Sequence, residues 1–173
     1  MRNPWTSLFA GAALALAAGR QPLALDAADR FGRHAQEVQE PVAPPTPANP
    51  EDQLRRATQH YADLVLAMDH AAIAALFTPD GEVAVEGQPP IQGPEAIRKH
   101  LESFKDYHVQ AETLTADTVA VQGTAGRVTG TYRQRVRLPA GDIVEVSGTY
   151  TADWQRDTAG VWRLRRMSTK SGS

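Results

Sequence analysis

A run of five prolines in ten residues, at positions 41–50, divides the sequence into a short leading part and a longer part that can fold. Proline fixes one backbone torsion and lacks an N–H, so such a run favours extended polyproline conformation and does not join a packed core. About 120 residues follow it, the size of one ordinary domain. The sequence therefore predicts one folded domain over residues 49–171, after a disordered proline-rich tether over residues 28–48.

The N-terminus has the pattern of a secretory signal. Residues 1–7 carry one positive charge, and residues 8–19 are uncharged and mostly apolar. This run is too short to span a bilayer, which takes roughly 20 residues, and a chain without cysteine cannot carry a lipoprotein anchor. We expect residues 1–27 to be a signal peptide and the mature protein to be secreted or periplasmic, with no stable membrane anchor. The alternative is a buried or frayed N-terminal helix.

Helix signals open the predicted domain. Asn49 can cap a helix, and Pro50 suits the first helical position. The acidic residues that follow stabilise the N-terminus of the helix, which carries a partial positive charge. The next apolar side chains recur at three- and four-residue steps and form one stripe: Leu54, Ala57, Tyr61, Leu64, Val65 and Met68. The pattern further predicts a short helix over 70–77 capped by Asp69, a turn over 78–81, a strand over 82–86 and a third helix that begins after Gly93.

After residue 107 the apolar period changes from helical to alternating. Strands are predicted over 109–115, 118–122, 127–138, 143–157 and 161–169. In two of them the apolar side chains alternate with polar ones, which predicts that the following face the core: Val128, Tyr132, Val136, Leu138, Val144, Val146, Tyr150, Ala152 and Trp154. The order of elements predicts an α+β domain, with three N-terminal helices packed on one face of a curved, mostly antiparallel sheet.

Several kinds of chemistry lack the residues that they need. Without cysteine there is no thiolate metal site, and the five histidines show no zinc-binding spacing. No glycine-rich phosphate loop and no G-x-S-x-G motif occurs. The net charge of -2 argues against a dedicated nucleic-acid binder. We therefore expect no metal, no cofactor and no nucleic-acid partner.

Five short sequence segments resemble those of a known family. They are YADLVLAMDHAAIAALF at 61–77, TPDG at 78–81, IQGPEAI at 91–97, GTYTADW at 148–154 and GVWRL at 160–164. In this order the sequence resembles the nuclear transport factor 2-like superfamily, and within it the SnoaL-like domains of unassigned activity, which are distant relatives of ketosteroid isomerase. The resemblance implies a cone-shaped half-barrel that encloses an apolar pocket, usually in a homodimer.

The resemblance also places candidate site residues. Tyr61 matches the position of the oxyanion donor of the isomerases, but Val85 and Ala152 stand where their base and second acid would lie. Because that mechanism needs a base and a donor on the same substrate, the chain should not be a ketosteroid isomerase. The residues expected at the pocket are Tyr61, His100, Tyr132, Tyr150 and Trp154.

Three functions remain open at this point. The preferred one is a domain that binds a small apolar or amphipathic molecule, with catalysis left open. The first alternative is an isomerase, cyclase or dehydratase that uses Tyr61 as a donor and His100 as a base. The second is a non-catalytic dimerisation module. An enzyme should place at least two titratable side chains in one cavity, a binder one or none, and an assembly module a filled core. A homodimer through the wet face of the sheet is expected, since Arg133 and Arg135 lie there and could meet Glu145 or Asp153 of a partner.

Overall fold

A long helix, α1 (Pro50–Ala67), begins where the cap signals predict it. In the computed structural model, which describes residues 49–172, the Asn49 side chain accepts a hydrogen bond from the Glu51 amide at 3.1 Å. The predictions of a signal peptide over 1–27 and a tether over 28–48 concern residues outside this range. No helix in the described range is both long and apolar enough to cross a membrane.

The second helix, α2 (His70–Ala75), is capped by Asp69, whose carboxylate accepts a hydrogen bond from the backbone N–H of Ala72 at 2.9 Å. The helix is shorter than predicted, because strand β1 (Phe77–Val85) starts directly after it. The turn predicted over 78–81 was wrong, since these residues belong to β1. Phe77 and Glu82 pair with the last strand on either side of a register shift, so residues 78–81 form a bulge inside β1, not paired with that strand, rather than a turn that ends β1.

A six-stranded open sheet follows. Its further elements are β2 (Ile91–Gln92), α3 (Pro94–Glu102), β3 (His108–Gln122), β4 (Ala125–Arg137), β5 (Ile143–Arg156) and β6 (Trp162–Ser171). The strand order is β2-β1-β6-β5-β4-β3, with β1 and β6 parallel and the other neighbours antiparallel. The two strands predicted over 109–115 and 118–122 are one strand, β3. Two bulges in it, at the register shifts with β4, interrupt the alternation of apolar and polar residues without ending the strand.

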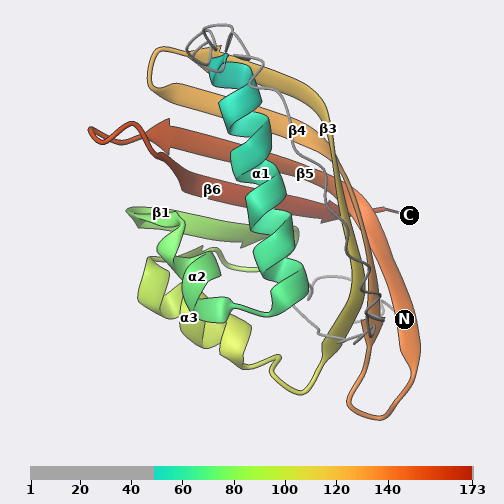
Figure 1. Ribbon diagram of the computed structural model, residues 1–173. Helices are drawn as coiled ribbons and strands as arrows, with labels where there is room; N and C mark the ends of the chain where they lie inside the picture. Colours follow the sequence, from blue (N-terminus) through green and yellow to red (C-terminus); the bar gives the residue numbers. More distant parts are fainter. Residues whose placement is uncertain (1–48, 173) are drawn as a thin grey trace, which may run out of the picture. The chain divides into compact units, whose positions relative to one another are not determined.

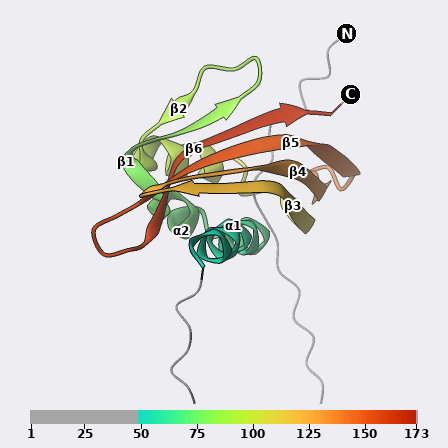
Figure 2. The ribbon, with the colours of Figure 1, turned by 90° about the horizontal axis from the view of Figure 1, so that it is seen from above.

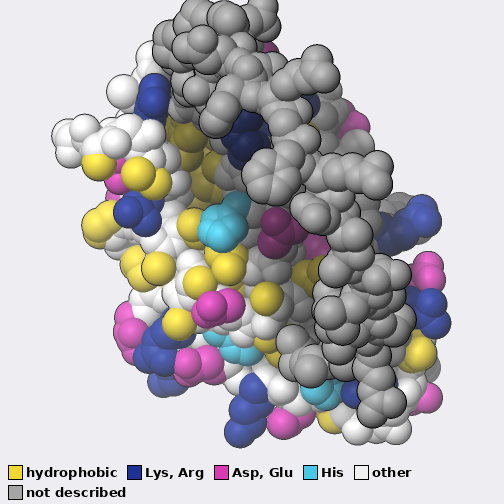
Figure 3. Space-filling view, in the orientation of Figure 1, with side chains coloured by type: hydrophobic (Ala, Val, Ile, Leu, Met, Phe, Trp, Pro, Cys, Tyr) yellow, Lys and Arg dark blue, Asp and Glu magenta, His cyan; other side chains and the backbone are white. Residues whose placement is uncertain are grey.

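All three helices lie on one side of the sheet, and β3 curves around α1 (Figures 1 and 2). The face of β4 and β5 toward the helices carries the alternating apolar residues that the sequence predicts, and Val128, Val136 and Ala152 are fully buried there. Figure 3 shows the helical side, where hydrophobic side chains gather over α2 and the adjoining part of α1. The predicted α+β fold is therefore confirmed, with an open sheet rather than a closed barrel.

Two glycines allow two tyrosine rings to lie across the inner face of the sheet. Tyr150 stands opposite Gly130, and Tyr132 stands opposite Gly148. A Cβ on Gly130 would lie 1.7 Å from the Thr115 carbonyl oxygen and 3.1 Å from the Tyr150 ring, and a Cβ on Gly148 would lie 2.9 Å from the Tyr132 ring. Only glycine fits at these positions, so the strands approach closely and bring the two tyrosines to the same part of the inner face.

Candidate functional site

A small cavity lies between α1 and the inner face of the sheet. It has a volume of about 20 Å³, which is room for about one water molecule. Side chains from one helix and four strands line it: Tyr61, Glu112, Leu114, Tyr132, Gln134, Tyr150, Met167 and Thr169. Polar groups from separate parts of the chain thus converge on one space in the apolar interior.

Glu112 reaches this cavity because of a bulge in β3. Val109 is fully buried, so strict alternation from it would point Glu112 to the outer face of the sheet. The register shifts by one residue between Val109 and Ala111, which leaves Gln110 as the extra residue. Glu112 is thereby turned inward, where it stands directly opposite Gln134 of β4.

Burial changes the acidity of Glu112. Loss of solvent around its carboxyl raises its pKa to about 8, and a hydrogen bond from the Gln134 amide opposes part of this increase. At neutral pH the group is therefore mostly protonated, yet it remains close to its titration range. A carboxyl in this state can both give and take a proton near pH 8.

The tyrosines of the cavity are held in their neutral form. Burial, together with the nearby Glu112 carboxyl, raises the pKa of Tyr61, and burial is also the main reason why the pKa of Tyr132 is raised. Burial, with a smaller effect of Asp117, raises the pKa of Tyr150 to about 12. The three hydroxyl groups consequently stay protonated and can donate hydrogen bonds over the whole physiological pH range.

Three enclosed polar atoms of the cavity have no hydrogen-bond partner among the described residues. They are Oε2 of Glu112, Oε1 of Gln134 and the hydroxyl oxygen of Tyr150. Gln134 and Tyr150 are only 2% and 3% exposed, respectively. A buried polar group without a partner costs about 1–3 kcal/mol, so all three atoms are suited to interact with something that enters the cavity.

The structure brings together only some of the residues expected at the pocket. Tyr61, Tyr132 and Tyr150 line the cavity, whereas His100 and Trp154 are not among the residues that line it. His100 lies on α3, where its ring and the Phe104 ring pack nearly at right angles with 5.1 Å between their centroids, and burial lowers the pKa of His100. The base assumed in the enzyme alternative is therefore not in this cavity.

Trp154 has a structural position instead. It is 1% exposed and stands opposite Gly126, where an added Cβ would lie 2.6 Å from the Leu54 side chain and 3.1 Å from the Trp162 ring. It shares the inner face of the sheet with Tyr132, as the alternation predicts, but it belongs to the packed core. Glu112 was missed at the level of sequence, because nothing in its surrounding residues marks the bulge that turns it inward.

Over residues 49–172, no cluster of three or more histidine, aspartate or glutamate side chains has an arrangement that could hold a metal ion. Two other acidic residues of the strands form ion pairs outside the cavity. Glu82 forms an ion pair with Arg166 at 2.8 Å, and Asp153 forms one with Arg127 at 2.6 Å. Glu112 is thus the acidic side chain among the described residues that lines the cavity.

Comparison with known proteins agrees with the fold. The sequence profile described as a SnoaL-like domain matches residues 48–168. No curated protein sequence matches the chain. An NTF2-like protein with a cystatin-like fold from Novosphingobium aromaticivorans is 25% identical, with a TM-score of 0.57 over 70% of this chain and 82% of that protein.

Two further solved structures have the same fold at lower identity. A ketosteroid isomerase-like protein from Erwinia carotovora atroseptica is 17% identical, with a TM-score of 0.59 over 71% of this chain and 93% of that protein. A proposed dehydratase of the NTF2-like family from Streptomyces avermitilis is 17% identical, with a TM-score of 0.59 over 70% of this chain and 96% of that protein.

Proposed function

The chain belongs to the SnoaL-like domain family, and we propose that it binds a small amphipathic molecule in the cavity beneath α1 and uses Glu112 to move a proton on it. The observation that carries this proposal is the enclosed Glu112 carboxyl among neutral tyrosine hydroxyls. A simple binder needs one titratable side chain in its cavity or none. Here Glu112 and three tyrosines share the same space, which favours catalysis over binding alone.

An isomerisation is the reaction that these groups support best. The Glu112 carboxylate takes a proton from a carbon next to a carbonyl group, so that a C–H bond breaks and an O–H bond forms on the carboxyl. Hydrogen bonds from Tyr61 or Tyr150 stabilise the negative charge that develops on the carbonyl oxygen. Glu112 then returns the proton to another carbon of the same molecule, and the reaction needs no second base.

The cavity in this conformation is smaller than such a molecule, so binding requires side chains to move. Met167 and Leu114 are the apolar side chains of the lining. The unbranched thioether of Met167 adapts easily to a new shape, because it has three rotatable bonds and a polarisable sulfur. Leu114 is only partly buried, so it can shift toward solvent. We therefore expect these two residues to make room for the ligand.

The test of this function is exchange of hydrogen for deuterium in D₂O. The full chain is incubated with a panel of ketones, including cyclohexenone, tetralone and the α-hydroxy ketone hydroxyacetone, and loss of the proton signal next to the carbonyl is followed by NMR. We expect at least one ketone to exchange faster than in buffer, with a rate that saturates as the ketone concentration rises. Exchange at the buffer rate for the whole panel would contradict the proposed chemistry.

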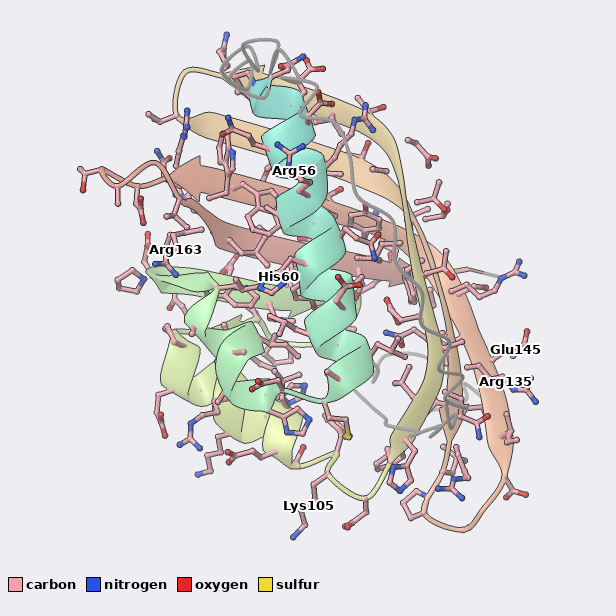
Figure 4. All side chains as sticks on the ribbon, in the orientation of Figure 1. Arg56, His60, Lys105, Arg135, Glu145 and Arg163 are labelled. Carbon is pink, nitrogen blue, oxygen red and sulfur yellow. The ribbon has the colours of Figure 1, made fainter. Side chains whose placement is uncertain are left out.

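A homodimer through the outer face of the sheet remains part of the proposal. Arg135 and Glu145 stand opposite each other on that face and project from the outside of the sheet (Figure 4). Asp153 is already paired with Arg127 of its own chain, which leaves Glu145 as the acidic group available to a partner. We expect light scattering of the purified protein to give the mass of two subunits, and Arg133→Glu with Arg135→Glu to weaken the dimer. A mass of one subunit at low salt would rule it out.

Export is proposed on the sequence pattern of residues 1–27 alone. Cleavage in this region would release a mature protein that begins upstream of α1 and contains the whole described domain. N-terminal sequencing of protein isolated from its native cells should find a first residue between Ala18 and Ala28. Recovery of an intact Met1 from a cytosolic fraction would show that the proposed export does not take place.

A further inference from the structure

The chemical character of the ligand can be inferred from the atoms that lack partners in the cavity. Oε2 of Glu112, Oε1 of Gln134 and the Tyr150 hydroxyl come from three adjacent strands and border the same space. The amide oxygen of Gln134 can only accept a hydrogen bond, whereas the Tyr150 hydroxyl can donate one. A ligand that accepts a hydrogen bond from Tyr150 and donates one to Gln134 therefore offers a donor and an acceptor a short distance apart.

The charge of the ligand is limited by the same lining. None of the eight described side chains around the cavity belongs to lysine, arginine or histidine. An anion in this space would lose its hydration without gaining a positively charged partner, and such burial is costly. It would also lie beside Glu112, whose own carboxylate form is disfavoured there for the same reason.

A cation is disfavoured as well. At neutral pH the Glu112 carboxyl is mostly uncharged. A cation that enters the cavity therefore either loses its hydration without a negatively charged partner or requires Glu112 to release its proton. The tyrosine hydroxyls do not supply a counter-charge, because burial keeps them protonated. A neutral molecule avoids both costs.

We propose that the substrate is an uncharged carbonyl compound with an N–H or O–H donor next to the carbonyl, such as an α-hydroxy ketone, and that a carboxamide binds in the same way without reacting. Its carbonyl oxygen accepts a hydrogen bond from Tyr150, and its donor group binds the amide oxygen of Gln134. In an α-hydroxy ketone, the C–H carbon that carries the hydroxyl then lies between the two groups, on the side of Glu112. The inference rests on the proposed function and defines the substrate class of that site.

Isosteric pairs of probes test the role of charge. Benzamide and benzoate have the same shape and differ in that benzoate is an anion at pH 7, and acetamide and acetate form a smaller pair. The full chain is labelled with [¹³C-methyl]methionine, and the two pairs are titrated at pH 7. Met167 lines the cavity, so its signal should change when a ligand binds there. Met68 is the C-terminal cap residue of α1 and is not among the residues that line the cavity, so it serves as an internal control. The variants Met68→Leu and Met167→Leu assign two of the three methionine signals, and the third belongs to Met1.

The expected result is a saturable shift of the Met167 signal with benzamide, at an affinity at least tenfold above that for benzoate, while the Met68 signal stays in place. Equal or tighter binding of benzoate would overturn the inference about charge but leave binding in the cavity intact. No shift of Met167 with any of the four probes would instead contradict the proposed function. The two failures are thus distinguishable.

The variant Tyr150→Phe separates recognition from folding. Because the Tyr150 hydroxyl has no described partner, its removal should leave the melting temperature unchanged or slightly raise it. Benzamide affinity should nevertheless fall by roughly tenfold, since one hydrogen bond to the ligand is lost. Tyr107→Phe, outside the described lining, is the matched control and should keep the affinity. Unchanged affinity in Tyr150→Phe would contradict the assigned hydrogen bond.

Discussion

Replacement of Glu112 with glutamine is expected to slow the deuterium exchange of a responsive ketone by about 10²–10⁴-fold. Glutamine has nearly the same shape as glutamate and can keep a hydrogen bond to Gln134, but it cannot take a proton from carbon. The rate is measured by NMR at saturating ketone, so that the loss is assigned to the proton transfer rather than to binding. A rate within twofold of the unmodified protein would remove Glu112 from the chemistry.

The same substitution elsewhere provides the control. Glu145 is an exposed side chain on the other face of the sheet, where it stands opposite Arg135. Glu145→Gln changes one carboxyl to an amide without touching the cavity, so its exchange rate should match that of the unmodified protein. Comparable losses in Glu112→Gln and Glu145→Gln would point to a general change of the protein rather than to proton transfer by Glu112.

The second large effect is on stability. The free energy of unfolding should decrease by about 3 kcal/mol between pH 4.5 and pH 7 through Glu112 alone. The unfolded carboxyl loses its proton near its usual pKa of 4.5, while the folded one holds it until about 8. In this window the folded state binds more protons than the unfolded state, so stability is full below pH 4.5 and is lost as the pH rises to about 8.

Urea unfolding at a series of pH values measures this effect, and Glu112→Gln isolates it. Other groups with shifted pKa values, such as His70 and Asp157, contribute equally to both proteins and cancel in the difference. The variant should therefore gain stability relative to the unmodified protein by about 1.4 kcal/mol per pH unit through the window. Parallel stability curves for the two proteins would mean that Glu112 has an ordinary pKa in the folded state.

Much of the fold could be predicted from residue patterns. The cap at Asn49, the stripe on α1 and the alternation in β4 and β5 are local signals, and the structure confirms each of them. Prediction was wrong where pairing between distant strands decides the conformation. The residues over 78–81 have the composition of a turn, yet they lie inside β1 as a bulge, because Phe77 and Glu82 on either side of them pair with β6.

The candidate site shows the same division. Tyr61, Tyr132 and Tyr150 could be placed on inner faces by period alone, and they line the cavity. Glu112 could not, because a single extra residue in β3 reverses which face it occupies, and a bulge of this kind depends on the register with β4. The carboxyl that distinguishes a proton-transferring cavity from an ordinary apolar core was therefore visible only in the structure.

The most direct measurement of the central claim is the pKa of Glu112 in the folded protein. A ¹³C-NMR titration of the side-chain carboxyl carbons between pH 3 and pH 10 resolves each glutamate, and Glu112→Gln identifies the signal that belongs to residue 112. A protonated carboxyl enclosed in the cavity should titrate near pH 8, apart from the exposed glutamates. Titration near 4.5 would show that Glu112 is solvated and charged at neutral pH, which contradicts its enclosure in the cavity, the observation on which the proposed function rests.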